Sequence, residues 1–161
     1  MFSLELTNAN ATLDNFNSRT EKIGPDKVPA ADLRITCPSD SAVLANFSPS
    51  LRSFIFDLNG PKDLADGVSI RDPHMVFPLA RDEEMTGATV QIAYGVGKPI
   101  EFTDCRINSF RITPMEGGTV VLTFRVQCRP DEKQAGKLYT LQEQAITLTL
   151  TPAELPEIKA A

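Results

Sequence analysis

Three arginines share the solvent-facing side of two neighbouring strand-like segments, and these side chains are well suited to bind a ligand. Arg125 and Arg129 alternate with apolar residues in segment 120–129, and Arg111 takes the corresponding side of the preceding segment. Guanidinium groups on a β surface can follow the phosphate backbone of a nucleic acid. We therefore expect Arg111, Arg125 and Arg129 to be nucleic-acid-binding candidates, with simple solvation of an exposed strand as the alternative.

The aromatic side chains of the same segments face the other way. Phe110 and Phe124 fall on the apolar, core-facing side, which is the wrong side for stacking on nucleic-acid bases. The chain has a formal net charge of -5 and a sequence pI of about 4.9. An acidic total disfavours strong nonspecific binding to nucleic acid, although a local basic patch can persist within it.

A second candidate site is the segment of apolar and charged residues that includes Phe77, Leu79, Arg81 and Glu83. If exposed, Phe77 and Leu79 would form an apolar anchor with a charged rim, an arrangement that suits a protein partner. We therefore expect these four residues to be candidates for partner binding. Packing of the two apolar side chains onto the core is the alternative.

Enzymatic and metal-binding patterns are missing from the sequence. His74 is the single histidine, so a histidine-dependent triad would depend on it and a zinc site would have only one imidazole. The nearest approach to a phosphate-binding glycine loop, residues 95–98, lacks the outer glycine and the terminal Lys-Ser/Thr pair. The acids and amides of residues 57–72 do not follow the spacing of a calcium loop and are typical of turns. We expect a non-enzymatic protein without a metal or cofactor.

Alternation of apolar and polar residues with a period of two dominates the chain and predicts strands with one buried face. The clearest segments are residues 2–6, 31–37, 90–96, 120–129 and 146–151. Residues 100–113 are also extended, but their phase slips as a β-bulge would cause. We expect a mainly β fold, an antiparallel sandwich or partly open barrel of six or seven strands with two short helical segments.

One hairpin can be placed in register. A bulge near residues 108–109 keeps the flanking apolar residues on one face, and a three-residue turn containing two glycines follows this strand. Ile112 then lies opposite Leu122, and Phe110 lies opposite Phe124.

The remaining segments predict helices and loops within a single domain, residues 1–161, whose length suits one core. Residues 41–57 and 131–142 show the helical spacing of apolar positions. Residues 15–29 and 58–87 are polar or rich in Gly, Pro and Asp, and they predict long loops.

The cysteines and the N-terminal residues indicate the compartment. Cys37, Cys105 and Cys128 fall on the apolar side of strand patterns, and an odd number without close spacing does not suit a disulfide scaffold. We expect reduced core cysteines.

Residues 1–16 lack the pattern of a secretory signal, and no apolar run approaches the roughly 20 residues of a membrane-crossing helix. We expect a cytoplasmic protein that does not enter a membrane.

Three segments, NSRTEKIGPDKVPAADLRI, VLANFSPSLRSFIF and FRVQCRPDEKQAGKLYTLQEQAITLTL, carry a resemblance that covers most of the chain. In overall pattern they resemble small uncharacterised proteins of tailed bacteriophages and prophages. Such proteins are found among early genes, near DNA recombination and replication functions. The resemblance implies an accessory role in phage DNA metabolism, or inhibition of a host system, in the cytoplasm of a bacterial host cell.

Taken together, these observations predict a non-enzymatic accessory binding protein of phage DNA recombination or replication. Its expected partner is single-stranded DNA or a phage or host protein of that machinery. A protein–protein inhibitor of a host defence system or nuclease is the first alternative. A structural virion module is the second, by analogy of fold alone. Assembly into a homo-oligomer stays open and would be required of a virion module.

Overall fold

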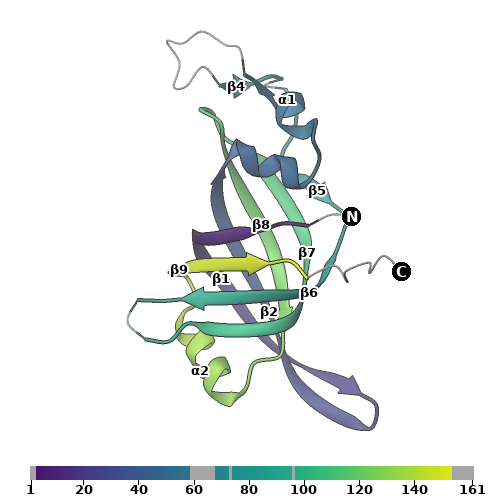
Figure 1. The fold of residues 1–161 in the computed structure, drawn as a ribbon, viewed down its shortest axis with the longest axis vertical. Coiled ribbons are helices and arrows are strands. Elements are labelled where there is room, and N and C mark those ends of the chain that lie inside the picture. Colours follow the sequence, from purple (N-terminus) through teal and green to yellow (C-terminus); the bar gives the residue numbers. More distant parts are fainter. Residues whose placement is uncertain (1–2, 59–67, 73, 96, 154–161) are drawn as a thin grey trace, which may run out of the picture.

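Six strands of the protein close into an antiparallel β-barrel (Figure 1). The computed structural model describes residues 3–58, 68–72, 74–95 and 97–153. Around the barrel the order is β7-β6-β9-β1-β2-β8, and β8 pairs again with β7. The barrel strands are β1 (Leu6–Ile23), β2 (Asp26–Asp40), β6 (Met85–Ala93), β7 (Ile100–Pro114), β8 (Thr119–Cys128) and β9 (Gln144–Thr151). The mainly β, antiparallel fold class predicted from the sequence is confirmed, and the barrel is closed.

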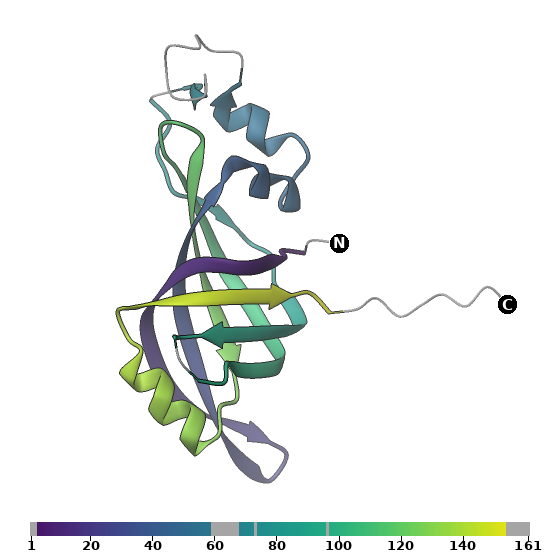
Figure 2. The ribbon, with the colours of Figure 1, turned by 60° about the vertical axis from the view of Figure 1, so that its left-hand side comes forward.

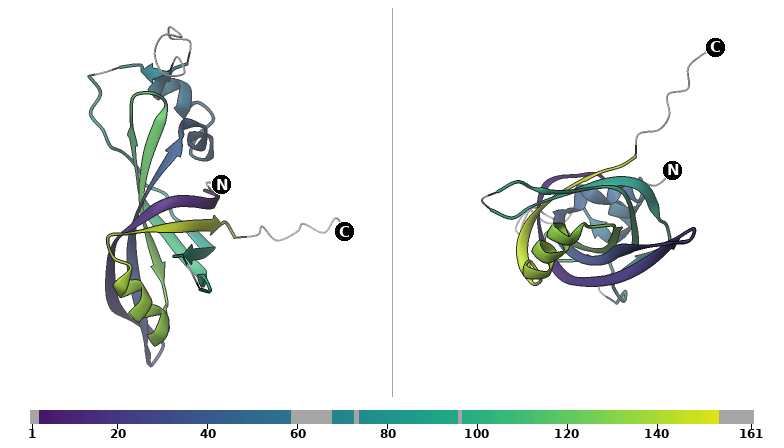
Figure 3. Two further views of the ribbon diagram at one scale, coloured as in Figure 1. Left: turned by 90° about the vertical axis from the view of Figure 1, so that its left-hand side faces the viewer. Right: turned by 90° about the horizontal axis from the view of Figure 1, so that it is seen from below.

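Short elements gather at the two ends of the barrel. They are the 3-10 helix η1 (Ser41–Asn46), α1 (Leu51–Ile55), β3 (Phe56–Asp57), β4 (Ser69–Ile70), β5 (Leu79–Arg81) and α2 (Glu132–Thr140). The predicted helical segments are both present, and α2 begins with a capping box at Asp131. Buried Leu138 and Leu141 attach α2 to the lower end of the barrel (Figure 3). No helix among the described residues has the length and apolar character needed to cross a membrane.

The barrel interior is filled by apolar side chains that alternate with outward-facing polar ones along each strand. Phe110 occupies the aromatic part of this core, with its ring centroid 5.7 Å from that of Phe47 and 6.0 Å from that of Phe124. Because Phe47 follows η1 directly, the same contact holds the helical end against the barrel wall. The free, buried cysteines expected from the sequence are confirmed at Cys37, Cys105 and Cys128.

A bulge in β7 falls at the predicted place. The pairing of β7 with β8 shifts between Asn108 and Arg111, and Ser109 there has a left-handed φ of 57°. Beyond the bulge, Ile112 lies opposite Leu122, as predicted. The extra residue returns the next apolar side chain to the core and leaves Asn108 and Ser109 on the outer surface beside β8.

Two strands, β6 of the barrel and the short β5, pair along one edge of β7. β6 pairs with residues 100–107 of β7, and β5 pairs with residues 110–112 farther along the same edge. Part of the predicted loop at residues 58–87 is therefore strand: β4, β5 and the start of β6. Residues 59–67 of that loop lie outside the described residues.

The prediction of a long loop at residues 15–29 is wrong. The chain there continues β1 and β2, which pair as far as Ile23 and Asp26 around a turn at Gly24 with a φ of 59°. Residues 18–29 form a two-stranded arm that projects past the end of the barrel (Figure 2). Most of its residues are exposed, so the sequence there lacks the alternation that marks a strand with one buried face.

The aromatic cluster generates a prediction for stability. Replacing Phe110 by alanine is expected to lower the free energy of unfolding by roughly 3–5 kcal/mol, because it opens a cavity between Phe47 and Phe124. Urea unfolding followed by circular dichroism measures this loss. Phe54, which is 56% exposed, is the matched control, and Phe54→Ala is expected to change the value by about 0.5 kcal/mol or less. Equal effects of the two variants would contradict the described core.

The buried cysteines generate a second prediction. Burial raises the pKa of the Cys105 and Cys128 thiols to about 12, so hardly any thiolate forms near neutral pH. Iodoacetamide at about pH 8 is expected to leave both thiols unmodified in the folded protein and to modify them after urea denaturation. Intact-mass spectrometry counts the added groups. Rapid modification of either residue in native buffer would show that it is accessible and ionised.

Candidate functional site

A groove of about 660 Å³ crosses the outer wall of the barrel where β1, β2, β8 and β7 lie side by side. Its charged side chains are Arg34, Arg111, Arg125 and Asp32. Neutral polar residues complete the walls of the groove: Asn15, Asn17, Ser109 and Thr123. We call this surface the arginine groove.

The strand register brings the three arginines together. Arg34 of β2 lies directly opposite Arg125 of β8. Arg111 of β7 lies opposite Thr123, two residues before Arg125 on β8. The residues on either side of each arginine point into the core, so the period of two turns all three arginines outward. Three cationic groups on adjacent strands therefore share one concave surface.

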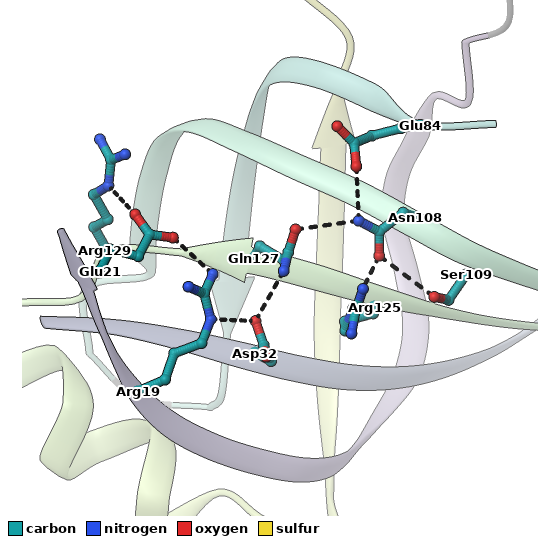
Figure 4. A network of polar contacts seen from close by, with 9 residues as sticks. All are labelled: Arg19, Glu21, Asp32, Glu84, Asn108, Ser109, Arg125, Gln127 and Arg129. Carbon is teal, nitrogen blue, oxygen red and sulfur yellow. Dashed lines mark hydrogen bonds and ion pairs between the residues drawn. The ribbon is translucent and has the colours of Figure 1, made fainter. Parts of the chain in front are cut away.

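Asn108 holds the Arg125 guanidinium without neutralising it. The Nε of Arg125 donates to Oδ1 of Asn108 at 2.9 Å. The Asn108 amide nitrogen donates to Oε2 of Glu84 at 3.0 Å and to Oε1 of Gln127 at 3.1 Å (Figure 4). With both sides of its amide bonded, Asn108 has a fixed orientation, and the bulge places it against β8. The result is an oriented arginine whose positive charge stays available to a ligand.

The acid of the groove is already engaged. Oδ1 of Asp32 accepts from Nε of Arg19 at 2.9 Å and from Nε2 of Gln127 at 3.3 Å. The side chains of Arg34 and Arg111 have no hydrogen bond or ion pair with any other residue that the structure describes. The arginine groove is therefore cationic within a chain whose total charge is -5.

Arg129 lies apart from the other two predicted arginines. Its Nε donates to Oε2 of Glu21 at 3.0 Å, while an NH2 group of Arg19 donates to Oε1 of the same carboxylate at 2.7 Å. The hydrogen bond from Arg129, followed by that from Arg19, holds the pKa of Glu21 below its usual range. The structure thus brings Arg111 and Arg125 together and places Arg129 in an ion-paired cluster at the base of the arm.

Arg34 was not among the arginines predicted from the sequence to bind nucleic acid. The residue lies on the polar side of the alternating segment 31–37, and this signal was present in the sequence. Its importance depends on the pairing of β2 with β8, in which Arg34 meets Arg125 across about 90 residues of chain. Local periodicity gives the face of a strand but not its neighbour.

The predicted partner-binding segment packs against the barrel. Leu79 pairs with Ile112 through β5, and the side chains of Phe77 and Leu79 are partly buried against the core. Arg81 and Glu83 form an ion pair with each other at the surface. The apolar half of the proposed anchor is therefore used by the fold itself.

A cavity of about 680 Å³ beside α1 is a competing candidate for the functional site. Leu51, Phe54 and Met75 supply its apolar wall. Its arginine, Arg71, donates from Nε to the carbonyl oxygen of Ser53 at 2.9 Å and from NH2 to a second backbone carbonyl at 3.1 Å. The cation of this cavity therefore holds α1 against β4 and β3, which leaves the arginine groove with the stronger case.

Metal-binding groups do not assemble in the described part of the chain. His74 is exposed, and its backbone N–H donates to Oδ1 of Asp72 in a turn. No group of three or more His, Cys, Asp or Glu side chains among the described residues is placed to hold a metal ion. Asn59, Asp63 and Asp66 of the acidic segment lie outside the described residues.

No protein-family model matches the chain, and neither a curated protein nor a solved structure matches it.

The pairing of Arg34 with Arg125 generates a prediction. Arg34→Gln is expected to raise the free energy of unfolding by roughly 0.2–1 kcal/mol at low salt, because like charges directly opposite each other destabilise a sheet. The gain should shrink as added salt screens the pair. Arg19→Gln is the matched control, and it should lower stability because Arg19 pairs with Asp32 and Glu21. A destabilising effect of Arg34→Gln in urea unfolding would mean that Arg34 has a structural role.

Proposed function

We propose that this protein is a non-enzymatic binder of single-stranded DNA that holds the phosphate backbone in the arginine groove. The observation that carries the proposal is the placement of Arg34 directly opposite Arg125, with Arg111 beside them and no carboxylate paired to any of the three among the described residues. Such an arrangement costs free energy in the unliganded protein. A bound anion removes that cost.

Phosphate fits the groove by geometry as well as charge. A guanidinium presents parallel N–H donors that match two phosphate oxygens, and arginine is favoured for this reason over lysine at phosphate sites. The neutral residues of the groove add hydrogen-bonding groups, among them the amides of Asn15 and Asn17 and the hydroxyls of Ser109 and Thr123. Amides and hydroxyls of this kind contact phosphate and sugar oxygens in protein–DNA complexes.

The groove is built for backbone contact rather than for base recognition. Its single aromatic residue, Phe124, has its ring in the core, where it packs on Phe110. Base stacking is therefore not available in the groove, and we expect little dependence on sequence. A single strand is favoured because a flexible chain follows a concave path on a small barrel, whereas duplex DNA is stiff over about 150 base pairs.

The biological setting of the proposal comes from the resemblance to phage early-region proteins. It is an accessory role in DNA recombination or replication in the cytoplasm of a bacterial host cell. The inhibitor alternative has less support, because Phe77 and Leu79, which would anchor a protein partner, pack against the barrel. A protein of the recombination machinery with an extended acidic segment would also satisfy the charge of the groove, and the DNA-binding experiment separates this case.

Fluorescence anisotropy with a labelled oligothymidylate tests the proposed function. Binding is expected to weaken with salt, with a slope of log K against log salt near -2, since three phosphate contacts contribute about -0.7 each for a single strand. The double variant Arg34→Ala/Arg111→Ala is expected to bind about 150-fold more weakly or worse, because each of the two lost hydrogen bonds to a charged group contributes about 1.5–3 kcal/mol.

The matched control removes the same charge elsewhere. Lys98 and Lys133 are exposed and do not line the arginine groove. Lys98→Ala/Lys133→Ala is expected to keep affinity within about threefold of the parent, since distant exposed charges are screened. Equal affinities of the two double variants, or no binding by the parent at low salt, would overturn the proposed function.

A further inference from the structure

A second cationic cleft, of about 370 Å³, lies between the β1 half of the arm, residues 19–23, and the end of the barrel wall formed by β7 and β8. Arg19, Glu21 and Lys22 line it from β1, Arg106 lines it from β7, and Arg129 lines it from the end of β8. We call it the arm cleft. We propose that the arm cleft is a second phosphate subsite for the same DNA strand, and that Glu21 takes the place of the phosphate in the free protein. This inference rests on the proposed function of the arginine groove.

The arm cleft continues the path of the arginine groove along β8. Arg125 lines the groove and Arg129 lines the cleft, four residues or about 13 Å farther along the same strand. Gln127 lies between them on the same outer face. Its amide bonds Asn108 on one side and Asp32 on the other, so neutral or already paired groups join the two cationic surfaces (Figure 4). One extended strand of a few nucleotides can therefore contact both.

The Glu21 carboxylate is bound in the way that a phosphate would be. Its Oε1 accepts from an NH2 group of Arg19 at 2.7 Å, and its Oε2 accepts from Nε of Arg129 at 3.0 Å. Two guanidinium groups that converge on two oxygens of one anion are a typical phosphate-binding arrangement. Both hydrogen bonds lower the pKa of Glu21, so the carboxylate is charged at neutral pH. Arg19 is also held by Asp32, which keeps its guanidinium oriented when Glu21 leaves.

The cleft keeps positive charge beyond what Glu21 neutralises. The side chain of Arg106 has no hydrogen bond or ion pair with any residue in the described ranges. Lys22 lies opposite Lys27 across the arm, so a like charge faces it. The second acid of the lining is Asp104, next to the barrel end of the cleft. Four cationic side chains therefore share the cleft with two carboxylates.

Glu21 can leave the cleft because, among the described residues, two arginines are the only side chains that hold its carboxylate. Most residues of the arm are exposed, so few other contacts oppose a change of its rotamer. A strand that is long enough to reach the arm cleft displaces the carboxylate and takes over both arginines. A short strand that fills the arginine groove alone leaves Glu21 in place.

Glu21→Gln tests this competition, because it removes the internal anion while keeping the shape of the side chain. With a 20-nucleotide oligothymidylate at low salt, the variant is expected to bind about 5–10-fold more tightly than the parent, because the strand no longer has to displace a carboxylate. Both proteins make the same phosphate contacts with this strand, so their salt slopes should agree. With a four-nucleotide oligothymidylate, the two proteins should bind alike. Glu5→Gln is the matched control. Glu5 is exposed and lies directly before β1, far along the chain from the arm, so its replacement should leave both affinities within about twofold.

Arginine side-chain resonances distinguish the failure of this inference from the failure of the proposed function. The Nε–H signals of the parent protein are followed by NMR during titration with the 20-nucleotide strand. Shifts of Arg34, Arg111 and Arg125 together with Arg106 and Arg129 support both sites. Shifts confined to the first three arginines leave the proposed function standing and overturn the arm cleft. No shift of any arginine overturns both, and an unchanged affinity of Glu21→Gln for the long strand overturns the role of Glu21.

Discussion

The pairing of β7 with β8 is the constraint on which the rest of the molecule depends. It closes the barrel, and the bulge within it decides which side chains lie on each surface. Phe110 and Phe124 meet inside, where they fill the core, while Arg111 and Arg125 are turned outward. The same bulge places Asn108 where its amide holds the Arg125 guanidinium. The bulge therefore determines both how the aromatic core packs and how the Arg125 side chain is held on the outer surface.

The outer wall of the barrel carries a local excess of arginine, although the chain as a whole is acidic. Arginines gather on the β1–β2–β8–β7 wall, and two acids there are engaged: Glu21 is shared between two arginines, and Asp32 is bonded to an arginine and an amide. Arg34 facing Arg125 departs from the ordinary rule that opposite charges face each other across a sheet. Departures from local rules concentrate at functional sites, where a ligand supplies the missing interaction. We propose that the unliganded fold is less stable at this wall than it would be with a bound anion.

Much of the fold could be predicted from the sequence, because most strands have one buried face. Alternation located β2, β6, β8 and β9 at least in part, whereas the segment predicted at residues 2–6 overlaps β1 only at Leu6. The phase slip in β7 located the bulge at Ser109. The pairing of Ile112 with Leu122 followed from the glycine turn. The arm could not be found in this way, since residues 18–29 pack on no core and carry no periodic signal. The choice between a sandwich and a closed barrel was also out of reach, because it depends on β9 inserting between β1 and β6.

The candidate site could be predicted only in part. Arg111 and Arg125 were found because one hairpin places them, whereas Arg34 needed the distant pairing of β2 with β8. Arg129 lies on the same side of the β8 segment as Arg125. The arm brings Glu21 into contact with Arg129, however, and only the three-dimensional structure shows that contact. Binding surfaces that several strands share depend on the order of strands, which local sequence does not encode.

A crystal structure of the protein with a bound oligothymidylate tests the central claim most directly. The account predicts phosphate oxygens within about 3 Å of the guanidinium groups of Arg34, Arg111 and Arg125, with the bases turned away from the barrel wall. An oligonucleotide bound elsewhere on the molecule, or bases packed against the groove with the phosphates in solvent, would contradict it.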